Sequence, residues 1–311
     1  MSIDIKKLLL KGREILEKES RQKRKQPEPA YHVSSCGLFL EKEQTTTGTC
    51  HRLAISRYFD VYTPVDPDRI LMFGGGRANE EVWVKELETS GEYQLKREEE
   101  IPVNDKTTKG TPVVGNPDIV LLKDGAPQQG LELKCASSYY TVRNVYFEGK
   151  PNLAHVVQAT YYSTILGIPF ELWYTSRVDF HVPDRDKKSI PTNDPAVELN
   201  YKRDPKKIKC VEVGFTLDKI GETVYYESNV LKNGKQQTIV TFAQMKKFLD
   251  FCDFLIEQKD LGPRPINLEP NGKKAGYSKC DYCDLKNICD RYENQYDEWL
   301  VEVKKLDEPP F

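Results

Sequence analysis

Residues 115–135 read GNPDIVLLKDGAPQQGLELKC, and this stretch decides the fold. Two apolar runs flank the turn KDGAP, so the sequence predicts a β-hairpin. With the turn centred on Gly125, residues whose numbers add up to 250 face each other, which places Asp118 opposite Glu132. Opposed residues in a hairpin have Cβ atoms about 4.5–5.5 Å apart. Lys134 shares a strand face with Glu132 because successive side chains alternate.

Two carboxylates at such a distance repel each other unless a cation lies between them. Asp118 and Glu132 therefore predict a site for Mg²⁺ or Mn²⁺, since such an ion takes one or two carboxylates and completes its shell with water and substrate phosphate. The ion would polarise a phosphate and acidify a bound water. Lys134 would orient that water or stabilise developing charge. The alternative is a buried structural ion pair between Lys134 and one acid, because both faces of the hairpin are apolar.

Downstream, the sequence predicts a helix over residues 152–166 that Gly167 and Pro169 end. A strand, FELWYTSRV, follows it. A strand, a helix and a strand in this order predict a mixed α/β core. Gln158 and Tyr162 lie four residues apart and so share one face of this helix. The alternative for this pair is an ordinary half-buried helix face.

The chain resembles the PD-(D/E)xK nuclease superfamily in three motifs. These are Asp118 after a proline, Glu132-x-Lys134 and Gln158-x3-Tyr162. The match is to its RecB-like branch, which includes the CRISPR-associated exonucleases and the AddB-like nucleases. The resemblance implies a restriction-endonuclease-like α/β core, with a mixed central sheet flanked by helices, in which all five residues are catalytic. It also implies metal-dependent hydrolysis of DNA, as single strands or ends, often with a helicase, integrase or recombination partner.

The same family places a third metal ligand on an upstream helix, often His or Glu after a glycine. A helix is expected here over residues 77–88, and the matching stretch, GGGRANEEVW, contains no histidine. Glu80, four residues after Gly76, is the first candidate for this ligand, and Glu81 is the second. The alternative is that both are solvated acids, which a helix N-terminus favours in any case.

A second signal lies near the C-terminus, where Cys280, Cys283 and Cys289 form C-x2-C-x5-C within GYSKCDYCDLKNICDRYE. This motif supplies three soft ligands, whereas a zinc site or an iron–sulfur cluster needs four. Other cysteines stand within expected strands or helices and are predicted to be plain core residues. These are Cys135, Cys210 and Cys252.

The resemblance implies where the fourth ligand lies. In the CRISPR-associated group the first cysteine stands far upstream in a C-x-R context, which Cys50-His51-Arg52 matches and Cys36 does not. The implied site is a [4Fe-4S] cluster held by Cys50, Cys280, Cys283 and Cys289. Its role would be mainly structural, because it would tie the N-terminal region to the C-terminal module. A Zn²⁺ ion held by the same thiolates is the alternative.

Composition bounds the class of protein. The chain has 311 residues, of which 38% are hydrophobic and 30% charged, with a net charge of −2. No apolar run approaches the roughly 18 residues that span a bilayer. The N-terminal residues 1–26 are too charged for a signal peptide and predict an amphipathic helix. We therefore expect a soluble, cytoplasmic protein with no membrane partner, in which disulfides are rare.

With no overall positive charge, nucleic acid would have to be held by local basic runs. Three stand out, at residues 21–25, 202–209 and 273–274, and each has a solvated loop as its alternative reading. The middle run supplies the predicted phosphate contacts. These are Lys202, Arg203, Lys206, Lys207 and Lys209.

The chain divides into four expected regions. Residues 1–60 form a mostly helical N-terminal region that contributes one cluster cysteine, and residues 61–177 form the nuclease core, with turns at 65–75 and a polar loop at 96–110. Residues 178–240 form a β-rich elaboration with an Asn233-Gly234 hairpin turn. Residues 241–311 hold C-terminal helices and the cysteine module. The first of these helices, TFAQMKKFLDFCDFLIEQK, has an apolar side that we expect to face inward.

The leading function is a DNA nuclease serving CRISPR adaptation, recombinational repair or viral DNA processing. A second hypothesis is a catalytically inactive nuclease fold that binds DNA or assembles with partners, and its basis is the irregular upstream motif. A third is a regulator that uses the cluster as a redox switch. The nuclease hypothesis predicts that replacing Asp118 or Lys134 with alanine abolishes DNA cutting but leaves the brown colour of the iron–sulfur cluster.

Overall fold

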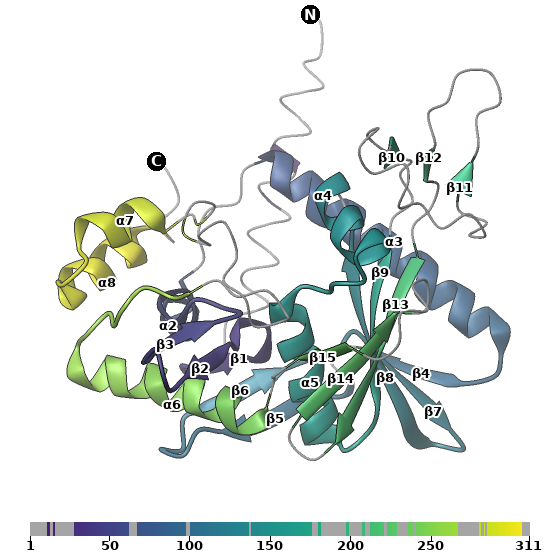
Figure 1. The fold of residues 1–311 in the computed structure, drawn as a ribbon, viewed down its shortest axis with the longest axis horizontal. Helices are drawn as coiled ribbons and strands as arrows, with labels where there is room; N and C mark the ends of the chain where they lie inside the picture. The colour runs from purple at the N-terminus through teal and green to yellow at the C-terminus, as the bar shows by residue number, and fades with distance from the viewer. Residues whose placement is uncertain are drawn as a thin grey trace, which may run out of the picture.

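A computed structural model of the chain shows the fold (Figure 1). It describes residues 11–12, 15, 28–61, 67–97, 100–136, 138–175, 180–181, 197–198, 207–208, 212–220, 223–228, 236–238, 241–266, 280, 283 and 285–306. Over these residues helices and several sheets alternate, so the fold is mixed α/β, as the sequence predicts. In this described part, no helix has the length and apolar character that crossing a membrane requires.

The largest sheet has seven strands in the order β15-β14-β13-β9-β8-β7-β4. Their bounds are β4 Gln94–Arg97, β7 Ile119–Lys123, β8 Ala126–Cys135, β9 Phe170–Thr175, β13 Glu212–Ile220, β14 Thr223–Ser228 and β15 Gln236–Thr238. Strands β8 and β9 are parallel, and every other neighbouring pair in this sheet is antiparallel. Three strands of the expected β-rich elaboration thus extend the same sheet as the predicted hairpin.

The hairpin of β7 and β8 has the predicted register where it matters. Ile119 pairs with Leu131, so the pairing sum of 250 holds at the end of the hairpin next to the two acids. At the tip the sum falls to 249, with Lys123 opposite Ala126, because a β-bulge interrupts the ladder between Leu121 and Leu122. The bulge leaves a two-residue turn at the tip, and its residues have positive φ angles, as such tight turns require.

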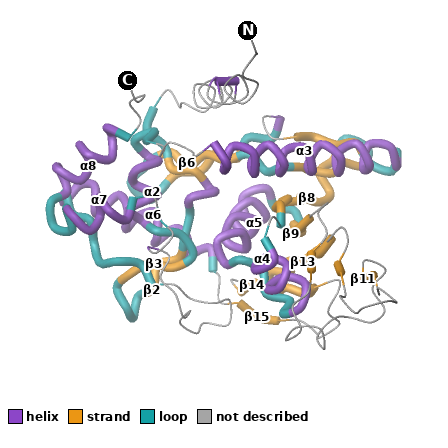
Figure 2. The backbone as a smooth tube through the Cα atoms, turned by 90° about the horizontal axis from the view of Figure 1, so that it is seen from above, coloured by secondary structure: helices purple, strands orange, loops and turns teal. Residues whose placement is uncertain are grey.

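Helices cover both faces of the sheet. Leu131 packs with Val84 of α3 (Pro67–Ser90) in one apolar cluster, while Leu172 of β9 lies in the larger core with Tyr162 of α5 (Leu153–Leu166). Figure 2 shows α3 as one long helix and places α5 separately, beside β8 and β9. Because side chains alternate along β8, Glu132 faces the opposite way from Leu131 and lies on the α5 side.

Helix α5 begins and ends where the sequence predicts. Asn152 caps its N-terminus by accepting the N–H of Ala154, at 2.9 Å, which satisfies one of the free donors of the first turn. Gly167 ends it in the left-handed conformation, with φ 67°, which glycine adopts without the penalty that a Cβ brings. Between β8 and α5 the chain forms a short helix α4 (Tyr139–Val142) and a π-turn η3 (Arg143–Phe147).

The remaining strands form small sheets. A three-stranded sheet has the order β1-β6-β5, β2 pairs with β3, and β12 lies between β10 and β11. Their bounds are β1 Tyr31–His32, β2 Leu38–Leu40, β3 Thr45–Thr47, β5 Val103–Lys106, β6 Pro112–Gly115, β10 Phe180–His181, β11 Val197–Glu198 and β12 Lys207–Ile208.

An N-terminal helix and the C-terminal helices pack together beside the sheets that contain β1 and β2. Helix α6 (Phe242–Gln258) packs on β2, and α2 (His51–Tyr58) contacts both α6 and α8 (Tyr296–Lys305). A capping box starts α6, and its predicted inward side is buried from Met245 onward. Helix α7 (Lys286–Arg291) lies against α8 (Figure 1).

Three expectations about secondary structure are wrong. Residues 31–47, which belong to a region expected to be mostly helical, instead form short strands and a 3-10 turn (η1, Val33–Ser35) before α2 begins. Residues 67–75 are not turns but the start of α3, since the packing of a long helix on the sheet outweighs the low helix propensity of glycine. The polar loop expected at 96–110 contains the end of β4 and all of β5.

Candidate active site and cysteine site

The predicted acidic pair lies at one end of the central sheet. Asp118 directly precedes β7, and its Oδ2 accepts the backbone N–H of Leu133 at 2.6 Å, which fixes its carboxylate against β8. Glu132 lies in β8, beside Leu172 of the parallel strand β9, and its side chain is fully buried. The two carboxylates are near enough for each to act on the other: Asp118 raises the pKa of Glu132.

Glu132 is short of partners. Lys134 forms an ion pair with Oε1 of Glu132, whereas Oε2 is buried and accepts no hydrogen bond. When Glu132 is protonated it can donate to the side chain of Asp118, which is one reason why its pKa is raised. Burial, and then the charge of Asp118, raise the pKa of Glu132 to about 8 despite the opposing effect of Lys134. Burial by itself would lower the pKa of Lys134, but the carboxylates around it outweigh burial, so its pKa is raised. The lysine therefore stays charged, while its side chain is still 21% exposed.

The two candidates for a third ligand differ in their surroundings. Arg97 at the end of β4 holds Glu81 by two hydrogen bonds, of 2.7 and 3.3 Å, and the Glu81 side chain is 63% exposed. Glu80 is more buried, lies 3.8 Å from the same arginine, and is near enough to Lys134 to raise its pKa. The structure therefore places Glu80, rather than Glu81, toward the predicted site.

Two side chains of α5, Gln158 and Tyr162, also reach this site. The hydroxyl of Tyr162, which is buried, donates to the carbonyl oxygen of Asn116 at 3.1 Å, two residues before Asp118. Burial and then the charge of Glu132 raise the pKa of Tyr162, and Gln158 acts on the same hydroxyl. Tyr162 thus fastens the segment that carries Asp118.

Sequence reasoning missed Gly115. A Cβ at this position would lie 2.9 Å from the Tyr162 hydroxyl and 2.9 Å from Val33, closer than side chains tolerate. Only glycine therefore lets the segment before Asp118 approach α5 closely enough for the hydrogen bond to Asn116. The GNPD sequence was the available signal, because glycine before a motif often marks close backbone approach.

Asp118 and Glu132 are the described acids that could hold a divalent cation here. In the described part of the chain, no three His, Cys, Asp or Glu side chains lie close enough to hold one ion, so Glu80 remains a predicted ligand only. Asp118 and Glu132 alone offer carboxylate oxygens, one of them buried and unpaired. That donor set suits Mg²⁺ or Mn²⁺, since such hard ions use few carboxylates and fill the rest of their shell with water and phosphate.

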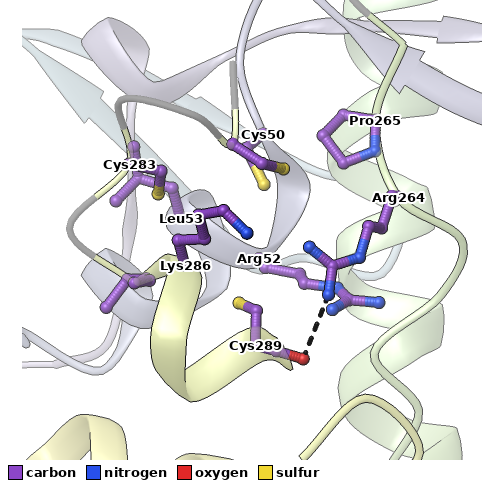
Figure 3. A pocket seen from close by; sticks show the side chains of 10 residues that line it. Cys50, Arg52, Leu53, Arg264, Pro265, Cys283, Lys286 and Cys289 are labelled. Carbon is purple, nitrogen blue, oxygen red and sulfur yellow. Dashed lines mark hydrogen bonds between the residues drawn. The ribbon is translucent and has the colours of Figure 1, made fainter. Parts of the chain in front are cut away.

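The four predicted cluster cysteines line one pocket, with Arg264 at its side (Figure 3). Cys50 is the residue before α2, whereas Cys280, Cys283 and Cys289 come from the C-terminal module. Local turns hold the last three: the N–H of Cys283 donates to Cys280 O at 3.2 Å, and that of Cys289 donates to Leu285 O at 2.8 Å. Residues more than 200 positions apart are thereby brought together.

The surroundings of the sulfurs act on the thiolate form in opposite directions. Burial raises the pKa of Cys50 to about 12, which favours the neutral thiol. The backbone N–H groups of Leu53 and Arg52, at the start of α2, lower the pKa of Cys50 and so favour its thiolate. The indole N–H of Trp299, which is buried, points at the sulfur of Cys289 at 3.4 Å. An all-cysteine donor set fits an iron–sulfur cluster or zinc.

The remaining cysteines separate into two groups. Cys36 and Cys252 are buried, and the prediction that Cys252 is a core residue is confirmed. The same prediction is wrong for Cys135, which is exposed because β8 ends there. Cys210 lies outside the described residues.

His51 is not placed as a metal ligand. Its ring is fully buried, and its two nitrogens contact Thr46 Oγ1 and the carbonyl oxygen of Leu261, both at 2.8 Å. Burial lowers the pKa of His51 to about 4, so the ring is neutral. It joins the start of α2 to the chain that follows α6.

The structure does not test the predicted phosphate contacts. Lys202, Arg203, Lys206 and Lys209 lie outside the described residues, and Lys207 is described only as backbone of β12. The basic runs at 21–25 and 273–274, the turn at 233–234 and nearly all of the N-terminal helix also lie outside the described residues.

No family model matches this chain, and no curated protein or solved structure shows significant similarity to it.

Proposed function

We propose that the chain is a metal-dependent DNA nuclease with a PD-(D/E)xK core. The proposal is carried by the state of Glu132. This acid lies beside Asp118 and is fully buried, and its Oε2 accepts no hydrogen bond. An unpaired buried carboxylate oxygen costs about 1–3 kcal/mol or more. Such a cost is typical of sites that are completed by a bound group, and strongly perturbed acids cluster at functional sites.

The charge balance favours a cation over a structural ion pair. Asp118 and Glu132 offer two negative charges, and Lys134 pairs with Glu132 through one oxygen only. Lys134 is too weak a partner to keep the pKa of Glu132 at its ordinary value. A divalent ion would supply the missing positive charge, since carboxylates this close favour their charged forms only beside a cation.

Each residue then has a role. Mg²⁺ or Mn²⁺, when bound, would supply the Lewis acidity that phosphodiester hydrolysis needs. Asp118 and Glu132 would hold it, with Glu80 nearby. The partly exposed ammonium of Lys134 would stabilise charge on the phosphate or orient the attacking water. Tyr162, together with Gln158, keeps the Asp118 segment in place.

The arrangement of the elements supports the same assignment. Three motifs converge on one end of a sheet that helices cover on both faces. They are the acid before β7, the Glu-x-Lys of β8 and the Gln-x3-Tyr of α5. Ligands commonly bind outside the carboxyl ends of parallel strands, and β8 and β9 are the parallel pair here.

From the family resemblance, we propose single strands or ends of DNA as substrate, with a helicase or integrase as partner.

We further propose that Cys50, Cys280, Cys283 and Cys289 bind a [4Fe-4S] cluster. They line one pocket, and four thiolates are the usual ligands of such a cluster. A zinc ion held by the same thiolates is the alternative. Bound in this pocket, the cluster would tie α2 to α7 and so close the chain around the core.

The test is cleavage of end-labelled single- and double-stranded DNA by protein purified without oxygen. We expect cutting only with Mg²⁺ or Mn²⁺. Asp118→Asn should lose at least about 100-fold in rate, the upper end of what losing an outer-shell partner costs a metal site. Asp124→Asn is the matched control, since it makes the same change at an exposed hairpin tip with φ 53°, which asparagine tolerates.

The other two hypotheses predict different results. A protein that absorbs near roughly 400 nm, as iron–sulfur thiolates do, and binds DNA but cuts nothing would be a binding or assembly module. A protein whose function needs the cluster in one oxidation state and no divalent cation would be a redox regulator. Cutting by Asp118→Asn at the wild-type rate would contradict the proposed active site.

A further inference from the structure

Arg52 is an incompletely paired charge at the cysteine pocket. Its side chain is 2% exposed, and it lines the pocket together with Arg264 (Figure 3). Nε donates to Leu261 O at 3.1 Å and Nη2 to Gly262 O at 2.6 Å. Nη1, in contrast, is buried and has no hydrogen-bond partner.

This arrangement is costly unless the pocket holds an anion. A guanidinium stays protonated in proteins, so Arg52 brings a full positive charge into the interior. Carbonyl oxygens carry only partial negative charge, and no carboxylate of the described chain pairs with it. Buried charges are normally paired, and an unmade bond to a charged donor costs more than to a neutral one.

Arg264 shows the contrast. Its guanidinium, with a side chain 30% exposed, is held by Glu293 at 3.0 Å and Asp290 at 2.6 Å, and it also donates to Cys289 O at 3.3 Å. Its charge is therefore balanced by two acids, although the guanidinium also hydrogen-bonds the side chain of Cys280. Of the two arginines that line the pocket, Arg52 is the one without an acid partner among the described residues.

We propose that Arg52 donates a hydrogen bond from Nη1 to the iron–sulfur group held by the four cysteines, and that its buried charge raises the reduction potential of that group. The inference rests on the proposed cluster. Four thiolates outweigh the positive charge of the iron–sulfide core, so the whole group is anionic. One-electron reduction makes it more negative, and a fixed positive charge stabilises the reduced form more. Hydrogen bonds and net charge are among the known determinants of cluster potentials.

The test is a titration of the cluster with dithionite as the electron donor, followed by EPR, in anaerobic protein of measured iron and sulfide content. In Arg52→Gln we expect the potential to fall by at least 59 mV, which is a tenfold change in the ratio of reduced to oxidised cluster. Arg57→Gln is the matched control, on the same helix, where the guanidinium bonds Ser35 at 2.7 Å and does not line the pocket. Arg264→Gln should shift the potential less than Arg52→Gln.

A second measurement covers the case in which Arg52→Gln fails to fold or to keep the cluster. Arg264→Gln protein is labelled with ¹⁵N-arginine, which leaves Arg52 as the arginine at the pocket. Pulsed EPR of its cluster, reduced by irradiation of the frozen sample, should show ¹⁵N hyperfine coupling. A merely structural role, through the bonds to Leu261 and Gly262, would produce neither the coupling nor the shift in potential.

The outcomes separate the two proposals. Wild-type protein that binds zinc, or no metal, refutes the cluster and with it this inference. A cluster whose potential is the same in Arg52→Gln and Arg57→Gln refutes the role of Arg52 and leaves the cluster standing. Absence of ¹⁵N coupling in the labelled protein would overturn the hydrogen bond in the same way.

Discussion

Replacing Glu132 with glutamine separates a cation site from a structural ion pair by the sign of its effect on stability. If the pair with Lys134 were structural, breaking it would destabilise the fold by about 3–5 kcal/mol. The surroundings of Glu132 predict the reverse. Burial and Asp118 raise its pKa from an ordinary value of 4.5 to about 8, so its charged form is disfavoured in the folded protein.

The pKa values set the pH window. Between pH 4.5 and about 8 the folded protein keeps a proton on Glu132 that the unfolded chain has lost, so stability falls as pH rises through this window. At 1.36 kcal/mol per pKa unit, the full effect above pH 8 is at most about 5 kcal/mol. Glutamine has nearly the same shape and no charge. Glu132→Gln should therefore match wild type near pH 5, exceed it increasingly up to about pH 8, and keep that advantage at pH 9.

The assay is urea unfolding of both proteins at pH 5, 7 and 9, with EDTA present to remove divalent ions. In separate samples without EDTA, saturating Mn²⁺ should raise the alkaline stability of wild type but not of the variant, because a ligand that binds only the folded state stabilises it. A variant that is less stable than wild type by the same amount at every pH would refute the reasoning and identify a structural ion pair.

Three further predictions follow from the same contacts. Gly115→Ala should destabilise the protein by about 1–3 kcal/mol through overpacking, whereas Gly75→Ala, in open space on α3, should stabilise it by up to about 1 kcal/mol; urea midpoints that move together would contradict this. Cys50→Ser should abolish absorbance near roughly 400 nm, and Cys135→Ser, at an exposed thiol, should keep it; equal spectra would exclude Cys50 as a ligand. Because Glu132 must lose its proton to bind a cation, the Mn²⁺ concentration for half-maximal cutting should rise about tenfold per pH unit below 8, and a flat profile between pH 6 and 8 would count against this site.

Local sequence rules predicted the part of the fold that positions the acids. The hairpin register depends on where the turn lies and on which residues must be buried, and both can be read from residues 115–135. The one-residue bulge at the tip could not be predicted, because it changes no apolar position near Asp118. Helix α5 was predicted because its cap and its terminal glycine are local signals.

Tertiary packing decided what sequence rules missed. The glycines before residue 77 indicate turns, yet α3 continues through them as part of one helix that packs on the sheet further along, at Val84. Likewise, the polar stretch at 96–110 forms strands because β7 and β6 supply partners for it. Strand pairing between distant segments leaves little trace in a single sequence.

The candidate sites, like the fold, were predicted from the sequence only in part. Hairpin spacing paired Asp118 with Glu132, and the family resemblance implied that Cys50 joins the C-terminal cysteines; the structure places all four cysteines at one pocket. Spacing could not show that Glu132 has an unpaired oxygen, or that Arg52 lacks a partner at the pocket, since both depend on three-dimensional burial. The need for glycine at position 115 arises from the close packing of Tyr162 and Val33 against it, which the GNPD sequence signals only weakly.

The central claim is that Asp118 and Glu132 together hold a divalent cation, and calorimetric titration of Mn²⁺ at pH 8 into wild type, Asp118→Asn and Asp124→Asn tests it most directly. We expect a binding site in wild type and in the Asp124→Asn control, and its loss in Asp118→Asn. Mn²⁺ binding that is equal in all three proteins would contradict the claim, because the cation would then be held elsewhere or not specifically.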